Sequence, residues 1–329
     1  MPIINRGDDY FQALTYTGNG STQTITGLRF QPDFVWIKGR SGATDHALYD
    51  VVRGVQKDLV SNSTAAETTQ STGVTAFTSD GFTVGSLAKV NTNGATYVYW
   101  AWKANGAGVT NTAGTITSTV SANTTAGFSI VTYTGTGSAP QSIGHGLGVT
   151  PSMIILKRRD TTSDWYVNHT SIGTNDLRLN TTDSSAANGI FSAKSSTTFT
   201  INSTIVQSGN WVAYVFAEVA GYSKFGSYIG NGSADGPFVF CGFRPRYVLI
   251  KASGLAESWY VYDSARNTYN VVDLELNPNN SGAEATFTTL DFVSNGFKIR
   301  NTNSAFNTSS ATYIYAAFAE NPFKYSLAR

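Results

Sequence analysis

The chain is short of charge, and this limits its partners. Only 13% of its 329 residues are charged, and the formal net charge is +1. An average globular protein carries about 25% charged residues. Non-specific nucleic-acid binding requires a basic stripe that neutralises phosphates, so the composition excludes a nucleic-acid partner of that kind. Gly, Ser, Thr and Asn take the place of charge and predict a neutral, polar surface.

Cysteine and long apolar runs are also scarce. The single cysteine, Cys241, excludes an intrachain disulfide and a cysteine-clustered metal site. Its apolar surroundings at 238–243 predict a small buried side chain rather than a reactive thiol. No window approaches the ~18 apolar residues of a membrane helix, and the N-terminal residues lack the pattern of a secretory signal. We therefore expect no membrane insertion.

Histidines and acids do not form a catalytic pattern. The three histidines (His46, His145 and His169) fall at different positions of an internal repeat, which is described below, and lack metal-ligand spacing. Gly-x-Ser-x-Gly is missing, so a serine nucleophile has no recognisable setting. Asp58, Asp176 and Asp273 recur at one position of an internal repeat, which suits a turn better than the paired acids of a glycosidase. The sequence predicts no enzyme, no cofactor and no metal site.

What the chain does contain is a threefold internal repeat. YTGNGS begins at Tyr16, YTGTGS at Tyr133 and YIGNGS at Tyr228. Each copy is followed by a proline and an apolar run ending in lysine, at Lys38, Lys157 and Lys251. Further landmarks recur in the same order, including HALYD (46–50), DWYVN (164–168) and SWYVY (258–262), and each copy closes on an aromatic run. Self-similarity at this period predicts three copies of one structural unit.

The residue pattern within each copy is that of strands. Short runs rich in Val, Ile, Thr and aromatic residues are bounded by Gly, Asn, Asp and Ser. Residues 96–102, TYVYWAW, are apolar on both faces, as in a central strand. We predict an all-β fold of three tandem antiparallel β-sandwich domains, jelly-roll-like in connection. The predicted divisions are an arm at 1–9, repeat 1 at 10–105, a segment at 106–125 that is either a linker or an extra strand, repeat 2 at 126–222 and repeat 3 at 223–329.

Two tryptophans are candidates for ligand contact. Trp165 and Trp259 occupy one repeat position, where repeat 1 is aligned with Ala47. They are either core residues or exposed platforms that stack on sugar rings. We place Trp165, Trp259 and three residues of the nearby turn, Asn277, Asn279 and Asn280, as candidate receptor or glycan contacts.

Several strings resemble a repeat domain of virion proteins from tailed bacteriophages, especially phages of aquatic bacteria. The strings are FSIVTYTGTG (128–137), HGLG (145–148) with Pro151 and Lys157, FAE (216–218) with GYSKFG (221–226), and YIGNGSADG (228–236). The family's proteins are described as tail fibres or minor structural proteins, and the resemblance supplies no catalytic residues. Repeat 1 lacks the HGLG turn and the GYSKFG joint, so we expect its neighbours in space to differ.

The resemblance implies a virion structural protein that forms a tail appendage. Its expected partners are other virion proteins, further copies of itself and a host-surface glycan, and its place is the tail or capsid surface after synthesis in the host cytoplasm. The alternatives are a capsid decoration protein or head fibre and, from another class, a free carbohydrate-binding module. We expect residues 1–9 to become ordered only against a partner, with repeat 1 facing the particle or its own symmetry mates and repeat 3 distal.

Overall fold

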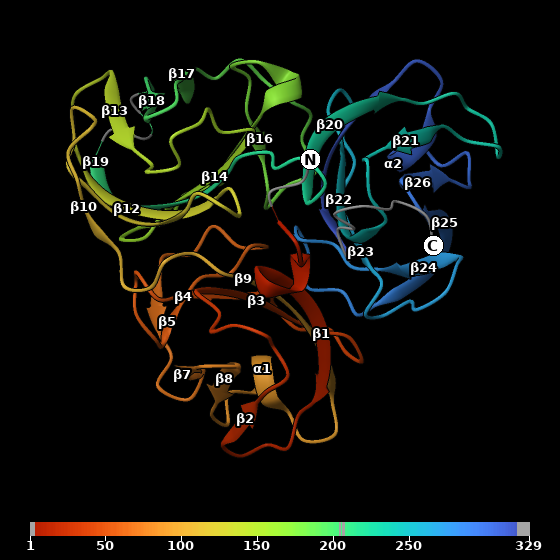
Figure 1. The fold of residues 1–329 in the computed structure, drawn as a ribbon, viewed down its shortest axis with the longest axis horizontal. Coiled ribbons are helices and arrows are strands. Elements are labelled where there is room, and N and C mark those ends of the chain that lie inside the picture. Colours follow the sequence, from red (N-terminus) through yellow and green to blue (C-terminus); the bar gives the residue numbers. More distant parts are fainter. Residues whose placement is uncertain (1–3, 204, 206–207, 321–329) are drawn as a thin grey trace.

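Antiparallel β-sheets form nearly all the regular structure of the protein, which confirms the all-β class. The computed structural model describes residues 4–203, 205 and 208–320. Figure 1 shows the three repeats arranged around a common centre, with repeat 1 in red and orange, repeat 2 in yellow and green, and repeat 3 in teal and blue.

Repeat 1 contributes a four-stranded sheet (β1-β9-β3-β4), a three-stranded sheet (β2-β8-β7) and a short pair (β5-β6). Its elements are η1 (Gly7–Asp9), β1 (Phe11–Thr17), β2 (Gln23–Ile25), β3 (Phe34–Gly39), β4 (Ala47–Asp50), β5 (Lys57–Asp58), β6 (Thr68–Thr69), β7 (Val74–Thr78), β8 (Gly81–Val84), α1 (Ala88–Asn91) and β9 (Thr96–Trp102).

Repeat 2 contributes a larger sheet in the order β10-β11-β12-β19-β14-β15-β16 and a three-stranded sheet (β13-β18-β17). Its elements are β12 (Phe128–Thr136), β13 (Gln141–Gly144), β14 (Met153–Arg158), β15 (Trp165–His169), η2 (Thr170–Ile172), β16 (Leu177–Arg178), β17 (Phe191–Lys194), β18 (Thr198–Ile201) and β19 (Ser208–Phe216). The segment at 106–125 supplies β10 (Val109–Asn111) and β11 (Ser118–Asn123), and β11 pairs with β12 along its whole length. Of the two predictions for this segment, the extra strand is therefore confirmed and the linker is wrong.

Repeat 3 contributes two four-stranded sheets, β20-β27-β22-β23 and β21-β26-β25-β24. Its elements are β20 (Ser223–Ile229), β21 (Phe238–Phe240), β22 (Pro245–Ala252), β23 (Trp259–Asp263), β24 (Val272–Glu275), β25 (Ala285–Val293), β26 (Gly296–Ile299), α2 (Ser304–Asn307) and β27 (Thr312–Ala319). The order β20-β27-β22-β23 has the same pattern as β1-β9-β3-β4 in repeat 1 and as β12-β19-β14-β15 in repeat 2.

The recurrent Gly-Asn-Gly motif has a packing reason. An added Cβ at Gly18 would lie 2.3 Å from the Thr92 carbonyl oxygen, and one at Gly230 would lie 2.2 Å from that of Thr308. Gly20 also has a φ of 72°, in the left-handed region that favours glycine. The motif thus lets the end of the first strand touch the backbone just after the short helix α1 or α2.

Both faces of the central strand β9 are buried, as its sequence predicts. Tyr97, Tyr99 and Ala101 belong to an apolar cluster within repeat 1, shared with residues of β2, β7 and β8. Val98, Trp100 and Trp102 belong to a different cluster, to which all three repeats contribute. One face of the larger sheet therefore packs inside its own repeat, and the other packs against the neighbouring repeats.

The shared central cluster bears on two expectations. Phe34 and Trp102 of repeat 1 meet Phe216 of repeat 2 and Phe318 of repeat 3 in it. The three repeats therefore surround one apolar centre, while the repeat that faces the particle stays a prediction. Ile4 is only 1% exposed and lies in the same cluster. Residues 4–9 are thus ordered by their own chain, whereas residues 1–3 lie outside the described residues.

Two smaller expectations can be compared with the structure. Cys241 is buried, as predicted, and burial raises the pKa of its thiol to about 12. Within the part of the chain that the structure describes, every helix is too short or too polar to cross a membrane.

Candidate binding site at the repeat junctions

Strand register aligns the three repeats residue by residue. The opposed pairs are Ile37/Ala47, Lys157/Trp165 and Lys251/Trp259. Extending the repeat 1 ladder by one residue places His46 opposite Lys38. His46, and not Ala47, therefore occupies the repeat position of the two tryptophans, which corrects the alignment made from sequence.

The ring at this position donates a hydrogen bond across a repeat boundary in every case. The bonds run from Trp165 Nε1 to the Val60 carbonyl (2.8 Å), from Trp259 Nε1 to the Arg178 carbonyl (2.9 Å) and from His46 Nε2 to the Asn277 carbonyl (2.9 Å). Repeat 2 thus bonds to repeat 1, repeat 3 to repeat 2, and repeat 1 to repeat 3. These contacts form a closed ring of three junctions.

The three repeated lysines reinforce the same ring. The bonds across the boundaries run from Lys157 Nζ to the Thr64 carbonyl (2.9 Å), from Lys251 Nζ to the Thr182 carbonyl (3.2 Å) and from Lys38 Nζ to the Gly282 carbonyl (2.8 Å). Burial lowers the pKa of each amine to about 8. The lysine that ends each apolar run is therefore a junction residue.

The residues predicted to contact a receptor lie at these junctions. Trp165 is 0% exposed and Trp259 is 1% exposed, so neither ring is a surface platform for a sugar. The Asn277 carbonyl accepts the bond from His46, while Asn279 Oδ1 accepts one from the Trp259 amide at 2.9 Å. Asn280 Oδ1 accepts one from the amide of Gly282. The 277–281 turn faces repeat 1 rather than forming a distal tip.

A buried charged network joins repeats 1 and 2. Arg53 Nε donates to Asp50 Oδ2 at 2.5 Å, and both side chains are 0% exposed. Arg53 also donates to Glu67 at 3.0 Å, and Arg159 of repeat 2 donates to both oxygens of Glu67. The Tyr214 hydroxyl of repeat 2 donates to Asp50 at 2.8 Å. Each buried charge therefore has an opposite charge and additional hydrogen bonds, the condition under which such a pair is tolerated.

Repeats 3 and 1 are joined by an equivalent network. Arg266 Nε donates to Asp263 at 2.7 Å and its Nη1 donates to Glu284 at 3.1 Å. Arg40 of repeat 1 donates to both oxygens of Glu284. Trp100 of repeat 1 donates to Asp263 at 3.0 Å, as Tyr214 does in the first network. Two of the three junctions thus contain the same arrangement of aspartate, arginine, glutamate and arginine.

The junction between repeats 3 and 2 has lost this network. His169 occupies the strand position of the aspartates, and Ala316 occupies that of Trp100 and Tyr214. His169 Nε2 donates instead to the Tyr315 carbonyl at 3.1 Å. Burial lowers the pKa of His169 to about 4, so an uncharged ring stands here in place of the charged aspartate.

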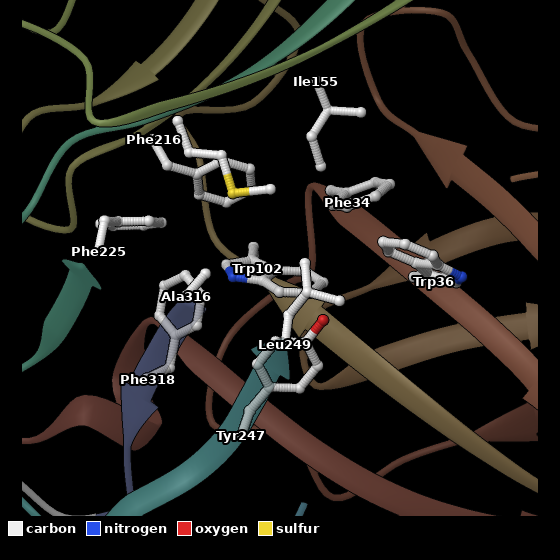
Figure 2. A pocket seen from close by; sticks show the side chains of 11 residues that line it. Phe34, Trp36, Trp102, Ile155, Phe216, Phe225, Tyr247, Leu249, Ala316 and Phe318 are labelled. Atoms are coloured by element: carbon white, nitrogen blue, oxygen red, sulfur yellow. The ribbon is translucent and has the colours of Figure 1, made fainter. Parts of the chain in front are cut away.

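At the centre of the ring lies an apolar cavity of about 20 Å³ (Figure 2). Figure 2 shows side chains from all three repeats around it, including Phe34, Trp102, Phe216, Tyr247 and Phe318. Its volume is that of about one water molecule, and its lining is almost entirely apolar. A water molecule needs two to four polar partners, so a cavity of this kind stays dry. It is a packing gap and not a ligand site.

A polar pocket of about 430 Å³ lies beside the junction of repeats 2 and 3. It is lined by Asp176, Arg178, Asp183, Ser184, Ala186, Asn188 and Ala256. Arg178 is ion-paired with Asp183 at 3.2 Å, and Asn188 Nδ2 donates to Asp176 Oδ2 at 3.0 Å. Asp176 is 1% exposed, its Oδ1 has no hydrogen-bond partner among the described residues, and burial raises its pKa. The pocket thus combines carboxylate acceptors with guanidinium and amide donors.

In the other two repeats, the acid equivalent to Asp176 has a side-chain partner from its own repeat. Bridges from Leu59, Leu177 and Leu276 to the neighbouring strand show that Asp58, Asp176 and Glu275 are equivalent. The sequence alignment grouped Asp273 with Asp58 and Asp176, and this was wrong, because Glu275 occupies the equivalent position in repeat 3. Asp58 is ion-paired with Lys89, and Glu275 accepts a bond from the Tyr262 hydroxyl at 2.9 Å.

Repeat 2 differs because an asparagine replaces the tyrosine. Tyr262 of repeat 3 corresponds to Tyr49 in repeat 1 and to Asn168 in repeat 2, since each follows the aligned ring position by three residues. The amide of Asn168 donates to the Gly173 and Asn175 carbonyls and not to Asp176. This break in the repeat, visible once the alignment is correct, is the sequence signal that identifies the pocket.

The histidines are dispersed and engaged with the backbone. His46 and His169 bond to carbonyls across junctions, and His145 Nε2 donates to the Ser195 carbonyl at 3.3 Å. Across residues 4–203, 205 and 208–320, no group of three or more His, Cys, Asp or Glu side chains could hold a metal ion.

No curated protein matches the sequence. A family profile described as "Domain of unknown function (DUF7483)" matches residues 6–322, which is almost the entire chain and includes all three repeats. The protein therefore belongs to the DUF7483 family.

Proposed function

We propose that the protein is a structural component of a bacteriophage virion that forms a tail appendage and contacts the host surface. The strings that resemble a repeat domain of virion proteins suggest this role. The observation that carries the proposal is the closed ring of junctions, in which one ring donor and one lysine per repeat bond to a neighbouring repeat. A single chain thereby becomes a rigid body that presents three related surfaces, which suits attachment to a symmetric particle.

The three repeats are, on this proposal, copies of one jelly-roll-like β-sandwich domain. The shared order of the larger sheets supports this, as do the apolar clusters between each larger sheet and its smaller partner. Fusion of the copies around a common apolar centre gives each larger sheet a second buried face. The protein then associates with further copies of itself and with other virion proteins through its outer surface.

The host contact that we propose is the polar pocket beside Arg178. Sugar hydroxyls donate and accept hydrogen bonds at once, and the exposed Asp183 and Asn188 offer both roles together with Arg178. The buried Asp176 accepts from Asn188 and holds it in place. This pocket replaces Trp165 and Trp259 as the place where a glycan would bind. The same pocket would serve a free carbohydrate-binding module, which is the rival function.

We also propose that the protein is not an enzyme. The dispersed histidines and their backbone hydrogen bonds support this view. Incubating the purified chain with host capsular and lipopolysaccharide glycans should release no oligosaccharide. Release that disappears on substitution of one acid would overturn this part of the proposal.

Locating the chain in an intact particle tests the virion role. Antibodies raised against the purified protein should label the tail of the particle in electron micrographs. Label spread over the capsid would instead support a decoration protein or head fibre. Particles without label, together with retention of the lone monomer on host polysaccharide, would favour the free binding module.

A further inference from the structure

The edge strand β21 exposes two phenylalanines. It is the outermost strand of the sheet β21-β26-β25-β24. Phe238 is 48% exposed and Phe240 is 59% exposed, while Val239 between them is buried in the repeat 3 core. Phe240 lies opposite Gly296, which has no side chain to cover the ring. Large apolar side chains on an open edge are uncommon, because such an edge pairs readily with other strands.

The outer side of β21 also presents main-chain groups. On the inner side of β21, the Pro237 carbonyl accepts from the Ile299 amide of β26, and the Cys241 amide donates to the Asn295 carbonyl next to β26. Residues alternate in an antiparallel ladder, so the amide and carbonyl groups of Phe238 and Phe240 face away from β26. The Tyr315 hydroxyl donates to the Phe240 carbonyl at 3.4 Å. The amides of both phenylalanines and the carbonyl of Phe238 remain directed toward the open edge.

Repeat 2 shows how the same edge is covered. Ser142 and Gly144 of β13 are equivalent to Phe238 and Phe240, because the residue between each pair lies opposite an equivalent phenylalanine of the next strand. The inserted segment lies along this edge. The Ile116 amide donates to the Ser142 carbonyl at 3.2 Å, Ser118 Oγ donates to the Gly144 carbonyl at 2.9 Å, and the Ser142 amide donates to Thr115 Oγ1.

The insert also contributes a buried apolar anchor. Ile116 is 7% exposed, belongs to the repeat 2 core and forms a parallel bridge with Ile143. In repeat 1 the equivalent edge positions are Thr24 and Thr26, both exposed and polar. Among the described residues, only the repeat 3 edge combines outward phenylalanines with no strand of the chain alongside it.

We infer that β21 is a docking site for an extended segment of a partner protein, which adds as a strand beside Phe238 and Phe240. The chain's own segment at 114–118 is the argument for this occupant, since it covers the same backbone groups in repeat 2 with an extended chain and one apolar side chain. The partner segment should carry apolar residues at alternate positions, because successive side chains of a strand point to opposite faces. This inference concerns the isolated protein and does not depend on the virion assignment.

The test is a variant that converts the repeat 3 edge into the repeat 1 edge. F238T/F240T replaces two exposed side chains by the residues found at Thr24 and Thr26, so the fold should be kept and thermal unfolding should be unchanged. A displayed library of random nine-residue peptides is selected on the wild-type protein, and the enriched peptides are synthesised as probes. Binding to the variant should be at least about tenfold weaker, as for the loss of anchor residues at an interface.

Hydrogen exchange then identifies the binding mode. The amides of Phe238 and Phe240 should exchange rapidly in the free protein and slowly with a bound peptide, whereas the Val239 amide, which faces β26, should change little. Failure to enrich any peptide, equal binding to the variant, or binding without protection of the two amides would each overturn the inference. A concentration-dependent dimer that is lost in F238T/F240T would show that a second copy covers the edge, and would overturn the partner segment as occupant.

Discussion

Trp36 donates its indole Nε1–H to His46 Nδ1 at 2.8 Å, and both side chains are buried. The register places this pair where repeat 2 has Ile155 with Trp165 and repeat 3 has Leu249 with Trp259. The tryptophan therefore lies on the first strand of the pair, β3, in repeat 1, and on the second strand, β15 or β23, in the other two repeats. The smaller side chain takes the opposite place in each case. In each case a ring nitrogen donates to a carbonyl of a neighbouring repeat.

This exchange predicts that two harmful substitutions compensate each other. H46W alone should overpack the junction and cost about 1–3 kcal/mol, and W36L alone should leave a cavity and cost about 2–5 kcal/mol. The double variant W36L/H46W recreates the Leu249/Trp259 pair and should unfold within about 1 kcal/mol of the wild type. Chemical denaturation of the four proteins measures the coupling. Simple addition of the two single effects would contradict the equivalence of the repeats.

Acid should weaken two junctions. Burial lowers the pKa of His46 well below its usual value and that of His169 to about 4. Below about pH 6.5 the unfolded chain therefore binds protons that the folded chain does not, and the free energy of unfolding falls as the pH falls from 6.5 toward 4. His46 has a further reason, since its Nδ1 accepts from Trp36 and cannot take a proton without losing that bond.

The double variant W36L/H46W supplies the control for this pH effect. It removes one of the two junction histidines and keeps the junction filled, so its stability should decline less between pH 6.5 and 4 than that of the wild type. Denaturation midpoints measured at half-unit intervals give the two slopes. Identical slopes would show that His46 does not contribute to the acid sensitivity.

Removing one member of a buried charge network should be costly. R53M leaves the 0%-exposed carboxylate of Asp50 without its counter-ion, and we expect a loss of about 3–5 kcal/mol. The matched control is K224M, which breaks the exposed pair with Glu218 and should cost about 0–1 kcal/mol. Calorimetry or denaturant titration measures both. Equal effects of the two substitutions would contradict the structural role assigned to the junction network.

The polar pocket predicts a separation of stability from binding. D176N keeps the shape of the side chain and removes a buried charge whose Oδ1 has no partner among the described residues, so stability at pH 7 should be unchanged or raised. Retention on host polysaccharide should fall, because Asn188 loses the charged acceptor that holds it in the pocket. D80N, at an exposed acid of repeat 1, should change neither property. Unchanged retention by D176N would remove the pocket from the proposed function.

The strands and their turns could be predicted from sequence because both depend on local chemistry. Asp80-Gly81 and Asn295-Gly296 mark hairpin turns in which Thr78 pairs with Gly81 and Val293 with Gly296. The apolar face shared by Tyr97 and Tyr99 follows from the two-residue period of a strand. Cys241 is buried where its apolar neighbours placed it.

The candidate site could not be predicted in the same way, because its residues depend on register and on contacts between repeats. Aligning HALYD with DWYVN letter by letter placed Ala47 beside Trp165, whereas the ladder places His46 there. A one-residue shift reverses the face to which each side chain points. The same shift concealed Asn168, whose difference from Tyr49 and Tyr262 identifies the pocket.

The sequence by itself determined the all-β class, the threefold repetition and the neutral surface, since strand period, recurring landmarks and composition are properties of the linear chain. Only the tertiary structure decided that the repeats form a ring and that Trp165 and Trp259 are buried in it. The physical reason is that each larger sheet is apolar on both faces. A second apolar face must be buried against another surface, but its composition does not specify which surface that is.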